Sequence, residues 1–315
     1  MRTLEEFEHF YSTVLKQKLS DLEDLRNRTK TKYYVLVVST IFIILVCSLL
    51  FLCVEELFVL FPLSFMFGIV SYPFFSYLII EKYRLTFKKS IISEMVLFYD
   101  ESLKYEPDKG IFLKAIQISN LFYLSMKEKF VSDDYVEGKI GETFVQFSEI
   151  QISSTSFFSS ADFHGLFLIA DFNKHFKGDY IILPDPFEKL LGSAVADTMQ
   201  HFNIMYRPPL IKMENPEFEN EFAVYGTDEI EARYIITPAL MDRMLDYKTK
   251  VGNKVYFSFT RSRLFVAIST DKELFEPTLF SSPDPKQIEL WNKDLYLALS
   301  IVNELNLNTR IWSKR

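Results

Sequence analysis

The sequence predicts an α+β cytoplasmic domain with antiparallel strands and flanking helices, attached to a two-helix transmembrane hairpin. Three observations predict this fold class. Two long uncharged apolar runs lie near the N-terminus, apolar residues alternate with polar ones in the middle of the chain, and helical spacing recurs on either side of that middle part. The chain has 315 residues, and 49% of them are hydrophobic, which excludes a disordered protein.

The two apolar runs cover residues 33–54 and 57–80, and neither contains a charged side chain. A helix rises about 1.5 Å per residue, so each run is long enough to cross the hydrocarbon core of a bilayer, about 30 Å. The alternative is a buried hairpin of a soluble protein, which the length of the runs disfavours. We therefore expect residues 33–80 to contact membrane lipid.

Lysine and arginine are distributed unevenly around these runs. Six lie between residues 16 and 32 and four lie between 82 and 89, whereas the connection between the runs contains only Glu55 and Glu56. Basic flanks normally stay on the cytoplasmic side of a membrane. Both termini are therefore expected in the cytoplasm, with a short acidic turn on the far side.

Helical periodicity marks three further segments. Residues 1–32 are predicted to form a cytoplasmic amphipathic helix, which either docks on the cytoplasmic domain or forms a coiled coil with a second copy or a partner. Residues 81–130 carry two apolar stripes and are predicted to be a helical connector. The C-terminal part, 285–315, begins with an Asp-Pro pair typical of a helix start, and we expect a helix there to about residue 306.

Residues 131–284 are predicted to form the α+β cytoplasmic domain. Alternating apolar residues indicate strands at 145–152, 166–170, 255–259 and 264–268. In the first of these strands the alternation changes phase at Ser148-Glu149, which predicts an irregularity at that point. The serine-rich stretch 153–160 is predicted to be a loop between strands.

The charge balance of the C-terminal part argues against several functions. Residues 90–315 carry 24 Lys and Arg against 33 Asp and Glu, whereas a nucleic-acid-binding domain normally presents a basic surface. No nucleic-acid partner is therefore expected. The sequence also lacks phosphate-binding glycine loops, a nucleophile elbow, an HExxH motif and an Asp-rich calcium loop. We therefore predict no cofactor, and the sequence favours a protein that is not an enzyme.

The densest polar cluster runs from Tyr225 to Tyr234. An Asp and a Glu three residues apart have the spacing of a capping box, and Glu229 with Arg233 forms an i,i+4 ion pair if the segment is helical. Helix caps and a surface ion pair account for every residue of the cluster. The alternative is a hydrolase or ligand-binding site with a catalytic Glu231 and an anion-binding Arg233. The candidate site residues are Glu231, Arg233, Asp228 and Tyr225.

Two histidines are the candidates for a metal site. His164 and His175 have aspartates nearby in the sequence, and on a helix His175 would share a face with Asp171 and Asp179. The segment around His175 lies between two strand-like runs, however, and is typical of a hairpin loop, which breaks that row. We therefore predict no metal site. Both cysteines, Cys47 and Cys53, fall in the first apolar run and are expected to be packing residues.

Several blocks of the sequence resemble the bacterial domain of unknown function 3137. They lie at residues 212–219, 222–228, 231–238, 134–141, 165–167 with 171–174, 274–277 and 305–310. The resemblance covers about residues 85–315 and extends to the hydrophobic hairpin before them. It implies a protein of the bacterial inner membrane. Because the family has no established catalytic residues, the resemblance assigns no site.

The sequence leads to hypotheses of different classes. The first is a membrane-anchored cytoplasmic protein-binding or scaffold module, which binds a protein partner or associates with itself. The second is a hydrolase or ligand-binding enzyme with a site around Tyr225 to Tyr234. Transport is the weakest hypothesis, because two spans without charged residues offer no ion pathway.

Overall fold

The computed structural model describes residues 2–53, 60–122, 128–154, 163–184 and 207–308. The chain divides into two compact units. The sheet unit comprises residues 1–4, 95–275 and 289–315, and the helical unit comprises residues 5–94 and 276–288. The predicted turn at Glu55 and Glu56, and the greater part of the predicted loop 153–160, lie outside the described residues.

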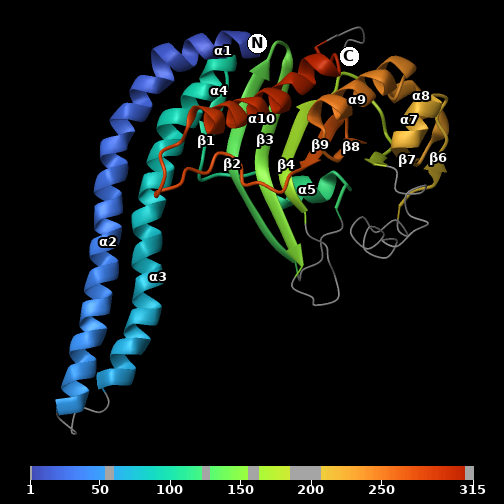
Figure 1. Ribbon diagram of the computed structural model, residues 1–315. Coiled ribbons are helices and arrows are strands. Elements are labelled where there is room, and N and C mark those ends of the chain that lie inside the picture. The colour runs from blue at the N-terminus through green and yellow to red at the C-terminus, as the bar shows by residue number, and fades with distance from the viewer. Residues whose placement is uncertain (1, 54–59, 123–127, 155–162, 185–206, 309–315) are drawn as a thin grey trace. The chain divides into compact units, whose positions relative to one another are not determined.

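An antiparallel sheet forms the centre of the sheet unit (Figure 1). Its nine described strands have the order β1-β2-β3-β4-β9-β8-β5-β7-β6. The strands are β1 (Lys104–Glu106), β2 (Glu128–Ile140), β3 (Thr143–Ser154), β4 (Phe163–Asp171), β5 (Tyr180–Pro184), β6 (Leu210–Ile211), β7 (Phe222–Gly226), β8 (Val255–Thr260) and β9 (Arg263–Ser269). At Gly165 the strands β4 and β9 lie so close that a Cβ atom would be 2.0 Å from the Ile268 carbonyl oxygen, which explains the glycine. The predicted antiparallel strands are confirmed.

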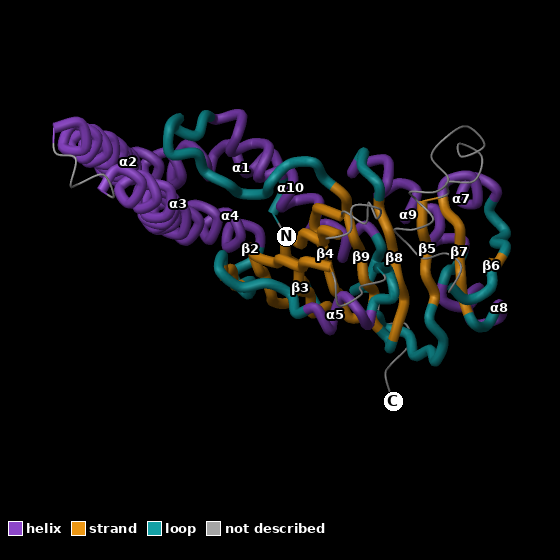
Figure 2. Tube along the Cα trace, turned by 90° about the horizontal axis from the view of Figure 1, so that it is seen from below, coloured by secondary structure: helices purple, strands orange, loops and turns teal. Residues whose placement is uncertain are grey.

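Both faces of the central strands are buried. All six residues of β8 are buried, and so are seven of the nine residues of β4. Figure 2 shows α5 (Leu113–Ile118) on one side of the sheet and α9 (Pro238–Val251) with α10 (Pro285–Glu304) on the other. The Tyr247 hydroxyl of α9 donates to the Leu297 carbonyl of α10 at 2.8 Å. Burial on two faces explains why the alternation of apolar residues in the sequence is incomplete.

The predicted irregularity at Ser148-Glu149 is present in the pairing of β2 with β3, but the extra residue does not belong to β3. This strand pairs with β4 in unbroken register from Val145 to Ile152. The extra residue lies in β2 instead, where Asp134 and its neighbour Tyr135 form a bulge and Asp134 has a φ of 54°. The phase of the apolar residues changes in β3 because its buried apolar side chains move from one face of the sheet to the other.

The segment predicted as a helical connector, 81–130, is only partly helical. Its helices are the end of α3 (Leu60–Phe87), the π-helical turn η3 (Lys88–Ile92), α4 (Ser93–Tyr99) and α5. Between them lies β1, and β2 already begins at Glu128. The short strand β1 forms because its three residues pair with 135–137 of β2 at the edge of the sheet, a tertiary contact that helical periodicity does not reveal.

Two long helices dominate the helical unit. They are α2 (Lys16–Cys53) and α3, which lie side by side in both views (Figures 1 and 2). A Cβ atom added to Gly68 of α3 would lie 3.1 Å from Ile44 and 3.5 Å from Thr40 of α2. Glycine therefore allows the two backbones to approach closely at this level, as small residues do between apolar helices.

The N-terminal segment is helical from Leu4 onward. It consists of α1 (Leu4–Phe10), the π-helical turn η1 (Tyr11–Leu15) and the first part of α2. Within the helical unit, Leu15 is fully buried and Lys18 forms an ion pair of 2.7 Å with Glu94 of α4. The amphipathic helix predicted for residues 1–32 is thus present, and its apolar face is at least partly used inside this unit.

Candidate functional site

Helix α8 (Glu229–Ile235) follows β7 after a short turn and carries two of the four predicted site residues, Glu231 and Arg233. Asp228 precedes the helix, and Tyr225 lies on β7. The N-cap of α8 is Asp228, whose Oδ1 accepts hydrogen bonds from the backbone N–H groups of Ile230 at 2.8 Å and Glu231 at 3.0 Å. Glu229 and Arg233 form an ion pair of 2.6 Å at the predicted i,i+4 spacing. The expected cap and the expected ion pair are both confirmed.

Glu231 does not complete a capping box with Asp228. Its carboxylate instead accepts hydrogen bonds from the backbone N–H groups of Lys177 at 3.0 Å and Gly178 at 2.8 Å, and from the Tyr180 hydroxyl at 2.7 Å. These donors lie on the connection between β4 and β5 and at the start of β5. Glu231 therefore fastens a loop to α8 across more than fifty residues of sequence.

The hydrogen bonds also fix the charge of Glu231. Its burial penalises the charged form, but the bonds from Tyr180, Gly178 and Lys177 favour it, and the net effect lowers the pKa of Glu231. For Tyr180, burial and the same hydrogen bond raise the pKa. A carboxylate that is ionised at neutral pH and receives three donors is suited to holding the loop in place.

Of the other predicted site residues, Asp228 contacts the Glu231 backbone as the helix cap, whereas Tyr225 and Arg233 have other partners. The Tyr225 side chain belongs to the buried cluster around α5 and is 7% exposed. The Arg233 side chain, by contrast, is 41% exposed. Besides Glu229 it contacts Glu214 at 3.6 Å and donates to the Lys212 carbonyl at 3.3 Å. Each residue thus has a local structural role within the sheet unit.

The two histidines lie near opposite ends of β4. His164, the second residue of β4, contacts the buried carboxylate of Glu149 at 2.5 Å, and that carboxylate also accepts from the backbone N–H of Leu274 at 3.1 Å. His175 follows the strand and lies 3.4 Å from the Ser262 hydroxyl. Its segment is not helical, so the row with Asp171 and Asp179 does not form. The segment is not a hairpin either, since β8 and β9 lie between β4 and β5.

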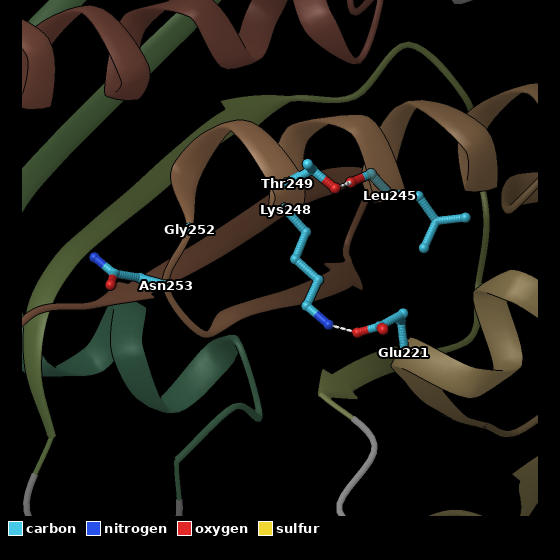
Figure 3. A pocket seen from close by; sticks show the side chains of 6 residues that line it. All are labelled: Glu221, Leu245, Lys248, Thr249, Gly252 and Asn253. Atoms are coloured by element: carbon cyan, nitrogen blue, oxygen red, sulfur yellow. Dashed lines mark hydrogen bonds and ion pairs between the residues drawn. The ribbon is translucent and has the colours of Figure 1, made fainter.

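A cavity of about 280 Å³ opens at the end of α9 (Figure 3). Across it the Lys248 ammonium forms an ion pair with Glu221, the last residue of α7 (Pro216–Glu221), and also lies 5.2 Å from the centre of the Phe222 ring. Leu245, Thr249, Gly252 and Asn253 complete the lining. The cavity contains none of the predicted site residues, and its lysine and carboxylate neutralise one another.

A second cluster of charges lies in the helical unit, and the sequence analysis missed it. Glu276 accepts a hydrogen bond from Arg84 at 2.9 Å and forms an ion pair with Lys88, whose side chain is fully buried. Arg84 also pairs with Glu81 at 2.8 Å. The hydrogen bond to Glu81 outweighs burial and, together with Glu276, raises the pKa of Arg84. We call these four residues the Glu276 clamp.

Comparison with known proteins gives one family. Residues 161–307 match the family model described as Protein of unknown function (DUF3137). The resemblance noted in the sequence is thereby confirmed for the range from β4 to α10, whereas the block at 134–141 lies outside the match. The family description names no activity.

One solved structure is similar to the chain at low identity. It is the crystal structure of the mycobacterial trehalose monomycolate transport factor A, TtfA, with 10% sequence identity and a TM-score of 0.35. The similarity covers 70% of this chain and 96% of that chain. No curated protein matches the chain.

Proposed function

We propose that this chain is a membrane-anchored cytoplasmic module that binds another protein. One observation carries the membrane anchor in this proposal. The helical stretch Leu4–Leu50 contains an 18-residue window with a mean hydropathy of 2.5, and none of that window is buried. This stretch has the length and composition to cross a membrane.

The exposed surface of the two long helices supports a lipid environment. Among the side chains that the structure describes between Tyr34 and Leu78, nineteen large apolar ones are exposed. Moving one such side chain out of water is worth roughly 1.5–3 kcal/mol, so together they favour lipid over water by tens of kcal/mol. A soluble protein would be expected to cover such a surface.

The orientation and the second crossing are part of the same proposal. Helix α3 lies against α2 and exposes Phe65, Phe67 and Val70, so it supplies the return crossing of a hairpin over 33–54 and 57–80. The ten basic residues that flank the hairpin support a topology with both termini in the cytoplasm. The membrane is then the bacterial inner membrane, as the family resemblance implies.

Two apolar side chains of the sheet unit support protein binding. Phe112, just before α5, is 84% exposed, and Ile230, in the first turn of α8, is 82% exposed. Large apolar side chains that stand out from a folded surface are typical anchors of protein interfaces. A protein partner or a second copy of the chain would cover them.

In-cell photo-crosslinking tests this function. A photoreactive phenylalanine analogue at Phe112 or Ile230 of the full chain should give a discrete protein adduct in the membrane fraction. The same analogue at the exposed Asn220 of α7 is the matched control and should give none. Ile230→Asp should remove the adduct formed from Phe112 if both residues contact one partner. Absence of a discrete adduct at both positions, or an identical adduct from Asn220, would refute protein binding.

A further inference from the structure

The segment 276–288, which we call the strap, is fixed to both long helices within the helical unit. At its start, Glu276 holds Arg84 and Lys88 at the end of α3 and in η3. Further along, the Leu279 carbonyl accepts a hydrogen bond from Arg26 of α2 at 3.0 Å, and Leu279 itself is buried. These contacts hold the backbone of the strap beside the basic parts of the two helices, next to their apolar parts.

Phe280 projects from the strap onto an aromatic group at the start of the apolar part of α2. Its ring centre lies 5.3 Å from that of Tyr33, edge-on, and 6.5 Å from that of Tyr34. The Tyr33 hydroxyl lies 2.6 Å from the hydroxyl of Tyr72 on α3. Aromatic residues of the strap, of α2 and of α3 thus meet at one level of the helical unit.

These contacts do not cover Phe280, which remains 52% exposed. Its neighbours Tyr34 and Val35 are 49% and 61% exposed, so the three side chains continue the apolar surface of α2. On the other side of this level, Lys32 and Lys82 are exposed. Near Phe280 the surface of the long helices therefore changes from basic to apolar, as it does where a helix enters a bilayer.

We propose that the strap is a third membrane contact, and that Phe280 lies at the boundary between the lipid headgroups and the acyl chains. The partner is the cytoplasmic surface of the bilayer, and the inference rests on the proposed hairpin anchor. Aromatic rings are favoured at this depth, because the polar headgroups and the apolar chains meet there. The adjacent lysines complement the phosphate groups of anionic lipids. The residues just before α10 are thereby tied to the membrane surface.

Depth-dependent fluorescence quenching in vesicles tests this inference. Phe280→Cys is introduced into the full chain with Cys47 and Cys53 replaced by alanine, labelled with an environment-sensitive nitrobenzoxadiazole dye, and reconstituted in phosphatidylethanolamine–phosphatidylglycerol vesicles. Lys286→Cys, an exposed position of the same unit, is the aqueous control, and Val38→Cys, an exposed position in the apolar part of α2, is the lipid control.

At position 280 the dye should show a blue-shifted emission. Lipids spin-labelled near the headgroup should quench it more than lipids labelled at the chain end, and iodide should quench it less than at position 286. Iodide access equal to that at 286 would overturn the inference, provided that the dye at 38 is quenched by lipid. Protection from both iodide and spin-labelled lipid would mean that protein covers Phe280, which also overturns it.

Loss of lipid quenching at 38 would instead refute the anchor itself. If the cysteine-free chain does not fold, Phe280→Trp in the otherwise unchanged chain gives the same readout. The emission is then measured as a difference from the parent, in which Trp291 and Trp312 are a constant background.

Discussion

Two carboxylates organise this molecule, one in each unit, and they are held in different ways. Glu231 of the sheet unit accepts hydrogen bonds from two backbone N–H groups and a tyrosine hydroxyl, and its partners are neutral. Glu276 of the helical unit contacts two cations, Arg84 and the fully buried Lys88. Removing a carboxylate that accepts from neutral donors loses a few hydrogen bonds. Removing a carboxylate next to a buried cation also takes away the negative charge that balances this cation.

The largest effect is expected from breaking the Glu276 clamp. Glu276→Gln should lower the free energy of unfolding of the full chain in detergent by about 3 kcal/mol, the low end for losing one partner of a buried ion pair. The thermal unfolding midpoint measures the loss. The matched control is Lys88→Met with Glu276→Leu, which removes both charges and should recover most of the stability. An unchanged midpoint in Glu276→Gln would contradict the role of the clamp.

A smaller loss is expected at Glu231. Glu231→Gln keeps the shape of the side chain but replaces one acceptor oxygen by a donor, so it should cost about 1–2 kcal/mol. Hydrogen exchange should accelerate specifically at the amides of Lys177 and Gly178, which donate to this carboxylate. Glu229→Gln is the control, because Glu229 lies on the same helix and forms an ion pair with Arg233 rather than with the loop. Equal exchange at these amides in the parent and in Glu231→Gln would show that the loop is held by other contacts.

The stability that Glu231 contributes should depend on pH. Its folded-state pKa lies below the usual value of 4.5, so its contribution to stability is fully present above about pH 4.5 and is lost as the pH falls through the lowered pKa. The difference in stability between the parent and Glu231→Gln should therefore shrink in acid. Unfolding midpoints of both proteins, measured over about three pH units below roughly pH 6, test this expectation. A difference that stays constant over that range would mean that the charge of Glu231 does not stabilise the fold.

The smallest effect is expected at Arg233. Its side chain is 41% exposed and that of Glu229 is 57% exposed, so Arg233→Ala should change the free energy of unfolding by no more than about 0.5 kcal/mol. Denaturant unfolding of the full chain in detergent measures this change. A loss of about 2 kcal/mol would place Arg233 beside Glu231 and Glu276 as a residue that holds the fold.

The sequence predicted those features that depend on neighbouring residues. The cap at Asp228, the ion pair from Glu229 to Arg233 and the helix starting at Pro285 follow from spacings of at most four residues. The partners of Glu231 lie more than fifty positions away, and spacing within one helix carries no information about them. The clamp joins positions 88 and 276, which only the folded chain brings together.

The same reasoning explains the errors in the sheet. Short edge strands such as β1 depend on their neighbours rather than on their own composition, so the connector appeared entirely helical. In β3 the buried side of the strand changes at Ser148, and a change of face produces the same shift in the apolar pattern as a bulge does.

Chemical labelling of one exposed residue in the sheet unit tests the anchored cytoplasmic module most directly. Asn253→Cys, in the full chain with Cys47 and Cys53 replaced by alanine, is treated with a membrane-impermeant maleimide in right-side-out and in inverted inner-membrane vesicles, after flotation of the vesicles. The account predicts that the protein floats with the lipid and is labelled only in the inverted vesicles. Labelling in the right-side-out vesicles, or protein left at the bottom of the gradient, would contradict it.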